Sequence, residues 1–340
     1  MKALTYLAAK KVAIEEHLLP ELAEGTIRVK VMYCGICGSD MGIYRGTHPR
    51  AKAPLILGHE LVGTVSEINN DGSRFQVGQR ALLYPQITCG TCYACTHGLM
   101  SACEHVNYFG IDRAGGIGEY IDVPEEFLIP VPDRLSNIAA SVIEPLAVAF
   151  HAAKKAQVAC AARVLIMGAG PIGLLLALTL RQQGVAEIWL SEISEWNIEM
   201  CKKMGFSAID TAKEELIPQI MNLTDGIGVD VVFECSGAGI VTESMTKVCR
   251  IGGTMCVVAT HKAPCRISFQ DIMFREQHIL GARGYAYDEF LSTVHAAAQM
   301  GEQLEAVVTH VIPLMEAGGV FEFIANRDNA TMKVLIDCQI

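Results

Sequence analysis

The sequence of 340 residues has no apolar run long enough to cross a bilayer, no cluster of basic residues and few charged residues. Its longest apolar runs, such as 172–180, reach about half of the ~20 residues that a membrane-spanning helix needs. Charged residues make up 19% of the chain and the formal net charge is -10, which would repel nucleic acid phosphates and anionic membrane surfaces. We therefore expect neither nucleic acid nor a membrane as a partner.

The N-terminal residues lack the apolar stretch and the small-residue cleavage site of a secretory signal, and the charged Lys10 and Lys11 follow soon after. This predicts a cytoplasmic protein. In the reducing cytosol, 13 cysteines do not indicate a disulfide framework. Because six of them lie between Cys34 and Cys103, metal binding is the first function to examine.

The length suits two globular domains, since hydrophobic residues make up 51% of the chain. About the first 140 residues alternate short β-branched runs with Gly, Asn, Asp and Pro, which predicts a β-rich domain with long loops. From Arg163 onward, apolar strands alternate with helical stretches, which predicts βαβ units and a parallel sheet. The expected strand and helix pairs are 163–167 with 171–183, 187–190 with 194–203, and 228–233 with 239–248. The last part has an expected helix at 287–300 and strands at 307–312 and 333–337.

Four cysteines in a glycine-containing loop have the spacing C-x2-C-x2-C-x7-C: Cys89, Cys92, Cys95 and Cys103. Such short spacings let one backbone turn present several thiolates to a tetrahedral ion, with the fourth from a nearby return of the chain. The pattern predicts a closed structural zinc site in a lobe of residues 86–104. Free thiols and an iron–sulfur cluster are the alternatives. Four cysteines in fifteen positions exceed ordinary usage, and no other feature suggests one-electron chemistry.

A second set of candidate ligands is dispersed along the chain. Cys37 stands in the segment 35–40, His59 precedes Glu60, and Glu144 precedes a proline. A catalytic zinc has three protein ligands and one open position, and Cys, His and Glu are suitable donors. The residues alone do not bring these segments together. Taken singly, Cys37 and His59 are more often ordinary buried or surface residues than ligands, and Glu144 before a proline could close a loop.

At these residues the chain resembles the zinc-containing medium-chain alcohol dehydrogenases, in particular the branch of sorbitol, threonine and sugar-phosphate or sugar-acid dehydrogenases. The resemblance runs nearly end to end. It includes segments 35–40, 58–60 and 115–120, the four-cysteine lobe, Glu144-Pro145, the glycine turn at Gly168, and Thr309-His310 with Pro313.

The family implies an α/β protein in which a Rossmann domain with a doubly wound parallel sheet is inserted into a β-rich, GroES-like catalytic domain. We expect the catalytic domain at 1–145 and 283–340 and the NAD-binding domain at 146–282, with the active site in the cleft between them. Relatives form dimers or tetramers through the cofactor domain, so the resemblance also implies a homodimer or homotetramer.

The resemblance further implies that Cys37 and His59 bind the catalytic zinc and that a carboxylate completes the protein ligands. Family members use the residue matching Glu60, the one matching Glu144, or exchange between the two, and both stay open here. Asp40 matches a carboxylate that hydrogen-bonds the zinc histidine and raises its basicity. A turn cap is the alternative for Asp40.

A glycine turn joins the expected strand 163–167 to an apolar helix and comprises Gly168, Ala169, Gly170, Pro171, Ile172 and Gly173. A G-x-G-x-x-G pattern between strand and helix predicts dinucleotide binding at the helix N-terminus. Gly168 permits the turn, Gly170 lets the pyrophosphate approach, and Gly173 allows close packing. Glu192 follows the next expected strand, where a carboxylate bonds the adenosine ribose and repels a 2′-phosphate, so NAD is favoured over NADP.

Zinc and NAD together imply a definite reaction: zinc lowers the pKa of a bound secondary alcohol, whose hydride passes to the cofactor to leave a ketone. Ser39 matches the hydroxyl that carries the alcohol proton away in relatives. Many relatives have a histidine three residues later, where this chain has Gly42. Tyr44, His48 or water are the candidate replacements.

The substrate is expected to be a small polyhydroxylated molecule. Arg283 resembles an arginine near the active site of polyol and sugar-acid members, and pairing with a carboxylate there would indicate an aldonic acid. A salt bridge at the domain junction is the alternative for Arg283, and Tyr44 is the other candidate substrate contact. A threonine-type amino-alcohol dehydrogenase and a non-catalytic protein that binds NAD and zinc stay open. A zinc-free quinone reductase would lack the cysteine lobe and Glu192.

Overall fold

The computed structural model describes residues 1–339, which form two compact units. The first unit comprises Met1–Glu144 and the described residues from Ala286 onward, and the second comprises Pro145–Tyr285. The sequence predicts domain boundaries at 145/146 and 282/283. The structure has them at 144/145 and 285/286, so the last segment begins three residues later than predicted. None of the described helices is long and apolar enough to cross a membrane.

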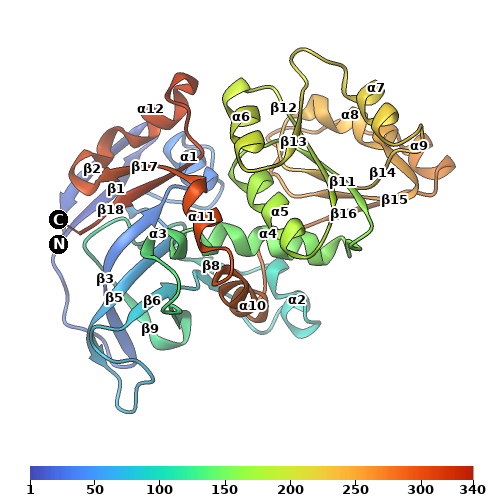
Figure 1. Cartoon of the computed structure of the whole chain (residues 1–340). Helices are drawn as coiled ribbons and strands as arrows, with labels where there is room; N and C mark the ends of the chain where they lie inside the picture. Colours follow the sequence, from blue (N-terminus) through green and yellow to red (C-terminus); the bar gives the residue numbers. More distant parts are fainter. Residues whose placement is uncertain (340) are drawn as a thin grey trace. The chain divides into compact units, whose positions relative to one another are not determined.

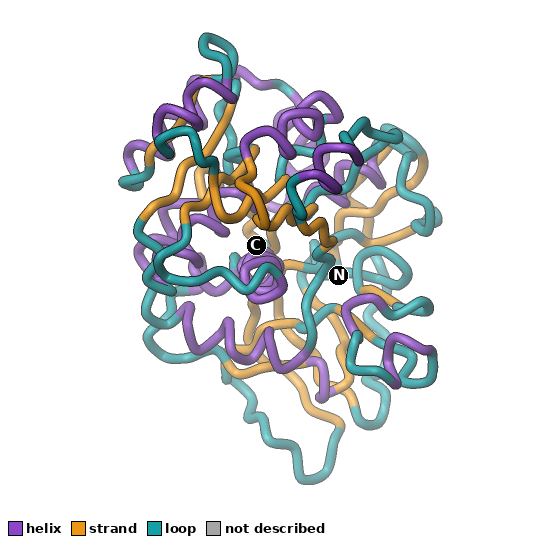
Figure 2. The backbone as a smooth tube through the Cα atoms, turned by 90° about the vertical axis from the view of Figure 1, so that its right-hand side faces the viewer, coloured by secondary structure: helices purple, strands orange, loops and turns teal. Residues whose placement is uncertain are grey.

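The first unit is built on a seven-stranded sheet with the order β10-β6-β5-β3-β18-β17, in which β9 also pairs with β3 (Figure 1). Its strands are β3 (Thr26–Gly35), β5 (Glu60–Asn69), β6 (Arg80–Leu83), β9 (Tyr120–Pro124), β10 (Leu128–Pro130), β17 (Val308–Pro313) and β18 (Lys333–Asp337). Smaller sheets contain β1 (Lys2–Ala8), β2 (Lys11–Glu16) and β4 (Leu55–Ile56), and β7 (Gln86–Ile87) with β8 (Asn107–Tyr108). Long loops, teal in Figure 2, connect many of these strands.

The helices of the first unit are short. They are α1 (Gly38–Tyr44), α2 (Tyr93–Thr96), α3 (Asn137–Ala140), α10 (Tyr287–Ala297), α11 (Gly301–Val307) and α12 (Val320–Ala325), while α4 (Ile143–Lys155) continues from the first unit into the second. The expected helix 287–300 therefore ends at Ala297, and a separate helix follows it.

Strand β3 contributes fully buried side chains to the core of the first unit. Ile27, Val29 and Val31 are fully buried while Lys30 is exposed, as expected for a strand with alternating faces. The C-terminal strand β18 pairs antiparallel with β3, with Leu335 opposite Gly35. The last part of the chain thus completes the sheet beside the segment that carries Cys37.

The second unit is a six-stranded parallel sheet with the order β13-β12-β11-β14-β15-β16, which confirms the predicted doubly wound Rossmann architecture. The strands are β11 (Arg163–Met167), β12 (Glu187–Glu192), β13 (Ser207–Asp210), β14 (Val229–Glu234), β15 (Cys249–Val257) and β16 (His278–Gly281). The helices are α5 (Pro171–Gln182), α6 (Glu195–Lys203), α7 (Leu216–Leu223), α8 (Gly239–Val248) and α9 (Phe269–Phe274).

Strands β12 and β14 run further than their apolar patterns predicted. Each ends in an acidic residue, Glu192 and Glu234. Because the strands are parallel, both carboxylates lie at the carboxyl end of the sheet, where ligands bind in open α/β folds.

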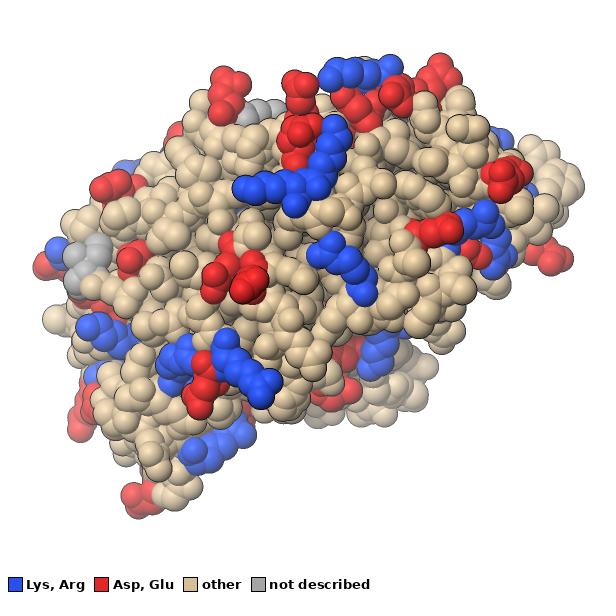
Figure 3. All heavy atoms as spheres, viewed as in Figure 1, with Lys and Arg blue, Asp and Glu red and all other residues tan. Residues whose placement is uncertain are grey.

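Charged side chains of both signs are scattered over the face that Figure 3 shows. Lys and Arg lie interspersed with Asp and Glu on this face. Ion pairs between exposed side chains occur among the described residues, for example between Lys202 and Glu199 at 2.7 Å.

Candidate metal centres and cofactor site

The Sγ atoms of the four cysteines in the predicted lobe lie within 4.8 Å of one another. The Sγ–Sγ distances are 3.9 Å from Cys89 to Cys95, 3.9 Å from Cys92 to Cys103, and 3.6 Å from Cys89 to Cys103. Four thiolates at a Zn–S distance of ~2.3 Å stand about 3.8 Å apart in a tetrahedron. The donor set and its spacing therefore fit a structural zinc ion.

Backbone amides favour the thiolate form in this lobe. The N–H of Cys92 donates to Cys89 Sγ at 3.3 Å. Backbone N–H groups of Thr91 and Cys92 lower the pKa of the Cys89 thiol to about 6. Desolvation and hydrogen bonds from neighbouring thiols raise the pKa of Cys95 to about 12, so a cation is needed for all of the ligands to be anionic together.

The dispersed candidate ligands come together in the first unit. Residue Cys37 is the N-cap of α1, and His59 and Glu60 stand at the start of β5. The pairing of Gly35 with Glu60 in the β3–β5 ladder brings the segments side by side. Ligand atoms of Cys37, His59 and Glu60 lie within 4.8 Å of one another, as a zinc ion would require.

Asp40 supports this cluster from within the core. It is fully buried, and its Oδ2 accepts a hydrogen bond from the N–H of Cys37 at 2.8 Å. Its Oδ1 lies 3.9 Å from His59 Nδ1. Burial alone would lower the pKa of His59, but the charges of Asp40, Cys37 and Glu144 raise it well above its usual value. The surroundings of this histidine thus attract positive charge.

A buried lysine, Lys333, lies beside the same cluster. Its Nζ pairs with Glu60 Oε2 and donates to the carbonyl of Ile36 at 3.0 Å. Burial opposes its charge, but Glu60 and Cys37 together raise its pKa above the ordinary value. A Cβ atom on Gly35 would lie 2.2 Å from Glu60 Oε2, so glycine leaves room for this carboxylate.

Sequence reasoning missed Lys333. The available signal was a single lysine at the start of the apolar strand β18, where a buried charge needs a partner. Its partner lies 273 positions away in the chain, at Glu60, and no local spacing connects the two.

The second candidate carboxylate, Glu144, lies near the same histidine. Its Oε1 accepts a hydrogen bond from the Tyr108 hydroxyl at 3.0 Å, and the Tyr108 ring stands edge-on to His59 with 5.5 Å between centroids. Glu144 is 6% exposed. Its charge acts on both His59 and Lys333. The compact set of ligand atoms contains Glu60 and not Glu144, so the role of Glu144 as a ligand stays a prediction.

Candidate proton-transfer groups differ in their surroundings. Ser39 Oγ lies 3.5 Å from His59 Nε2. The Tyr44 hydroxyl donates to Glu322 and the Tyr44 ring stacks on Phe321. Both the hydroxyl and the ring therefore have partners within the first unit. His48 is half-buried, and its Nδ1 accepts from the backbone N–H groups that follow it, which leaves Nε2 for another partner.

The glycine turn in the second unit has the geometry that a dinucleotide requires. Gly168 has φ +101°, and a Cβ there would lie 2.9 Å from the backbone nitrogen of Ser236. A Cβ on Gly173 would lie 2.0 Å from the carbonyl oxygen of Gly168. Around Gly170, the N-cap of α5, nothing described lies within 4 Å of an added Cβ, so space is left at the helix N-terminus.

Glu192 holds this turn from the adjacent strand. Its Oε2 accepts from the N–H of Ala169 at 2.9 Å and from Asn197 Nδ2 at 3.2 Å. Its Oε1 accepts from the N–H groups of Ile193 and Ser194. The carboxylate thus stands beside the glycine turn, at the position expected for contact with a ribose.

Arg283 lies in the second unit, between β16 and α10, and its side chain is exposed. The metal ligands lie in the first unit. Its substrate contact therefore stays a prediction.

Comparison with known proteins agrees with this geometry. Residues 23–133 match the family model of the alcohol dehydrogenase GroES-like domain, and residues 171–299 match that of zinc-binding dehydrogenases. The chain belongs to the zinc-containing medium-chain alcohol dehydrogenases. It is a zinc-dependent oxidoreductase with a nicotinamide cofactor, as the sequence predicted.

Among its relatives, a 2-dehydro-3-deoxy-L-galactonate 5-dehydrogenase of Pseudoalteromonas atlantica is 31% identical over 99% of both chains. An L-threonine 3-dehydrogenase of Pectobacterium atrosepticum is 29% identical over 99% of this chain and 94% of the relative. The crystal structure of 2R,3R-butanediol dehydrogenase from Bacillus subtilis superposes with a TM-score of 0.91 at 28% identity, covering 99% of each chain.

The cysteine lobe yields a prediction about stability. We expect Cys92→Ser to remove one zinc ion per chain and to lower Tm by about 5 °C or more, because a structural metal contributes directly to folding free energy. Zinc content by elemental analysis and thermal unfolding measure the two effects. Cys160→Ser, at an exposed cysteine outside the lobe, is the control. Unchanged zinc content in Cys92→Ser would contradict the site.

The glycine turn yields a second prediction. Gly170→Ala should leave Tm within about 1 °C of the parent, since its Cβ meets no described atom, but weaken NAD binding by about tenfold or more, because that space receives the pyrophosphate. Gly173→Ala should lower Tm as well, because its Cβ would collide with the Gly168 carbonyl. Thermal unfolding and NAD titration separate the effects, and unaltered NAD affinity in Gly170→Ala would refute this placement.

Proposed function

We propose that this enzyme interconverts a secondary alcohol of a small polyol or sugar acid and the corresponding ketone, with NAD as the hydride acceptor. The observation that carries the proposal is the buried cluster of Cys37, His59 and a carboxylate. This donor set leaves one position open for a substrate oxygen. A protein that only binds NAD and zinc would have no need to retain this open set.

The two bound groups supply Lewis acidity at the substrate oxygen and a hydride acceptor. The residues of the chain supply the rest. Asp40, which accepts a hydrogen bond from the N–H of Cys37, places its other carboxylate oxygen 3.9 Å from His59 Nδ1, and we assign it the orientation of this histidine. Ser39 is placed to accept the alcohol proton, since its hydroxyl lies 3.5 Å from His59 Nε2. Gly42 has no side chain that could pass the alcohol proton on to solvent, so we assign this transfer to His48 or to water.

Lys333 is a positioning residue in this proposal. By pairing with Glu60 it limits the reach of that carboxylate toward the metal. Glu144 accepts a hydrogen bond from the Tyr108 hydroxyl and is the second candidate carboxylate. We propose that the pair Glu60 and Lys333 adjusts which carboxylate completes the ligands as substrate binds.

Glu192 supports the choice of NAD over NADP. Its carboxylate stands beside the glycine turn, where a 2′-phosphate would meet negative charge. The stretch between Ser191 and Lys202 contains no arginine or lysine that could offset this repulsion.

The proteins similar to this chain include a sugar-acid dehydrogenase and a butanediol dehydrogenase. Arg283 favours a carboxylate-bearing substrate, because a guanidinium binds carboxylates through two parallel hydrogen bonds. The threonine dehydrogenase relative makes an amino alcohol the second candidate. A cytoplasmic location is part of the proposal, supported by 13 cysteines in the free form.

We also propose that the enzyme is a homodimer or homotetramer assembled through the second unit. Strand β16 lies at the edge of the parallel sheet, and Ile279 on it is 46% exposed. Phe269 and Phe274 of α9 are 76% and 70% exposed, which is unusual for an uncovered surface. Light scattering should give two or four chains per particle, and Phe274→Glu should shift the population toward monomers. A monomeric parent protein would overturn this proposal.

The function is tested by NADH formation with zinc-loaded protein across a panel of polyols, sugar phosphates, aldonic acids and threonine. We expect a clear rate with an aldonic acid or polyol and NAD, and a rate with NADP lower by about tenfold or more. A preference for threonine would support the amino-alcohol alternative. No turnover with any class, at two zinc ions per chain, would contradict the proposal.

Ser39→Ala is the matched variant for this panel. Loss of a positioned proton acceptor should lower kcat by about 10²-fold or more at unchanged zinc content. Parent-like turnover in Ser39→Ala would remove this serine from the proton transfer.

A further inference from the structure

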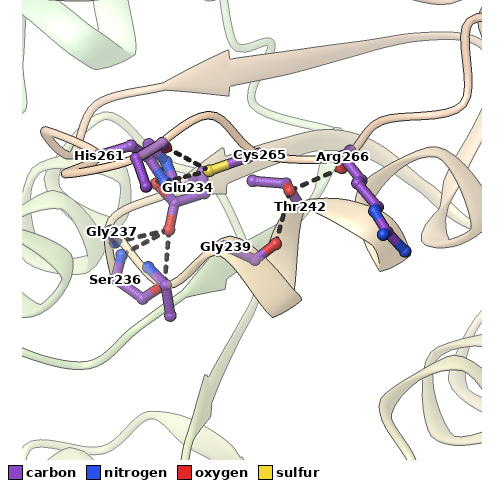
Figure 4. Close-up of polar contacts among 10 residues, drawn as sticks. Glu234, Ser236, Gly237, Gly239, Thr242, His261, Cys265 and Arg266 are labelled. Carbon is purple, nitrogen blue, oxygen red and sulfur yellow. Dashed lines mark hydrogen bonds and ion pairs between the residues drawn. The ribbon is translucent and has the colours of Figure 1, made fainter.

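A carboxylate, an imidazole and a thiol form a connected row in the second unit (Figure 4), whereas the predicted zinc ligands belong to the first unit. Glu234 ends β14 and is fully buried, and its Oε2 lies 2.8 Å from His261 Nε2. On the other side of the ring, His261 Nδ1 lies 3.0 Å from Cys265 Sγ. The histidine is 16% exposed, and the cysteine lies at the surface.

The buried carboxylate is fixed on its other oxygen. Oε1 of Glu234 accepts from the N–H and hydroxyl of Ser236, at 2.8 and 2.6 Å, and from the N–H of Gly237 at 2.9 Å. Both oxygens are therefore occupied, and the one that faces His261 is held in place. A carboxylate in this position orients the imidazole and stabilises its protonated form.

The thiol and the imidazole lie within hydrogen-bond distance, so a proton can pass from Sγ to Nδ1. When the Sγ proton passes to His261 Nδ1, the resulting imidazolium lies between the thiolate of Cys265 and the carboxylate of Glu234. Helix α8 adds a second source of stabilisation, since Cys265 Sγ lies 3.4 Å from the place where a Cβ on Gly239 would stand, in the first turn of that helix. A helix N-terminus and a neighbouring histidine both favour the thiolate, which is the reactive form.

The loop that carries the cysteine is tied to the same helix. The Thr242 hydroxyl lies 2.8 Å from the carbonyl oxygen of Arg266 and 2.7 Å from that of Gly239 (Figure 4). The thiol is thus held over α8 by contacts of its own loop.

The loop that follows Glu234 packs against the glycine turn. The strand order of the sheet reverses between β11 and β14, and the crevice at such a reversal is where dinucleotides bind. The loop after β14 contains Ser236, whose backbone nitrogen would lie 2.9 Å from a Cβ on Gly168. The hydrogen bonds of Glu234 therefore fix a loop that packs directly against the glycine turn.

We propose that Cys265 is a peroxide-sensitive thiol, activated by His261 and Glu234, whose oxidation weakens NAD binding. The thiolate of Cys265 attacks one oxygen of hydrogen peroxide; an S–O bond forms and the O–O bond breaks. The departing oxygen takes the proton held by His261 and leaves as water. The sulfur loses two electrons to become a sulfenic acid, and the peroxide is reduced by the same two.

The consequence for the cofactor follows from the shared contacts. A sulfenic acid adds an oxygen atom between Sγ and the imidazole, so His261 must move. Glu234 then loses the partner of a buried charge, and the Ser236 loop that it holds shifts against Gly168. NAD binds the arrangement with the intact loop, so oxidation lowers its affinity.

The chain offers a matched control in Cys160. This cysteine is also exposed, but its Sγ donates to the backbone carbonyl of Gln183 at 3.3 Å instead of contacting an imidazole. Exposure alone would make the two thiols equally reactive. Activation by His261 would make the Cys265 thiol react with peroxide faster than the Cys160 thiol.

The test uses zinc-loaded enzyme, limiting hydrogen peroxide, and a dimedone probe that traps sulfenic acids for peptide mass spectrometry. Cys265 should be labelled about tenfold or more faster than Cys160, and His261→Gln should bring its rate down to that of Cys160. Titration with NAD, without substrate, should give a Kd raised about fivefold or more in the oxidised protein and restored by dithiothreitol. Cys160→Ser should respond to peroxide as the parent does.

Cys265→Ser should keep the parent Kd for NAD and lose the response to peroxide. Equal labelling of Cys160 and Cys265 would overturn the proposal, as would an unchanged Kd after oxidation of Cys265. Weakened NAD binding in peroxide-treated Cys265→Ser, together with loss of zinc, would assign the effect to the zinc cysteines and would also overturn it.

Discussion

Buried negative charge is the constraint on which the catalytic centre depends. Asp40, Glu60 and Glu144 are each less than a tenth exposed and converge around one histidine, and Lys333 supplies a single buried cation among them. Burying an uncompensated charge costs several kcal/mol, so this part of the first unit needs a further cation at its ligand atoms. We propose that a zinc ion would meet that need.

The second unit applies the same principle to carboxylates at strand ends. Glu192 and Glu234 end the two strands that flank β11, and each collects backbone N–H groups from the loop that follows it. These hydrogen bonds shape the crevice at the reversal of strand order, where the glycine turn lies. The loops that receive NAD are thus held by ionic groups, which makes them sensitive to chemical change at His261 or Cys265.

Features fixed by local spacing could be predicted from the sequence. The four cysteines of the lobe and the glycines of the turn lie within fifteen residues or fewer, so the backbone alone brings them together. The parallel sheet of the second unit followed from the alternation of strands and helices. The dispersed ligands Cys37 and His59 required a family resemblance, because only the β3–β5 ladder joins their segments.

Contacts between distant residues could not be predicted in this way. The pairs Glu60 with Lys333 and Glu234 with His261 join different elements, and each residue alone has an ordinary sequence context. The central claim, that buried carboxylates, Cys37 and His59 form a second metal site, is tested most directly by anomalous X-ray diffraction at the zinc edge. We predict two peaks per chain, one among the four cysteines and one beside His59. A peak in the cysteine lobe alone, in zinc-replete crystals, would contradict it.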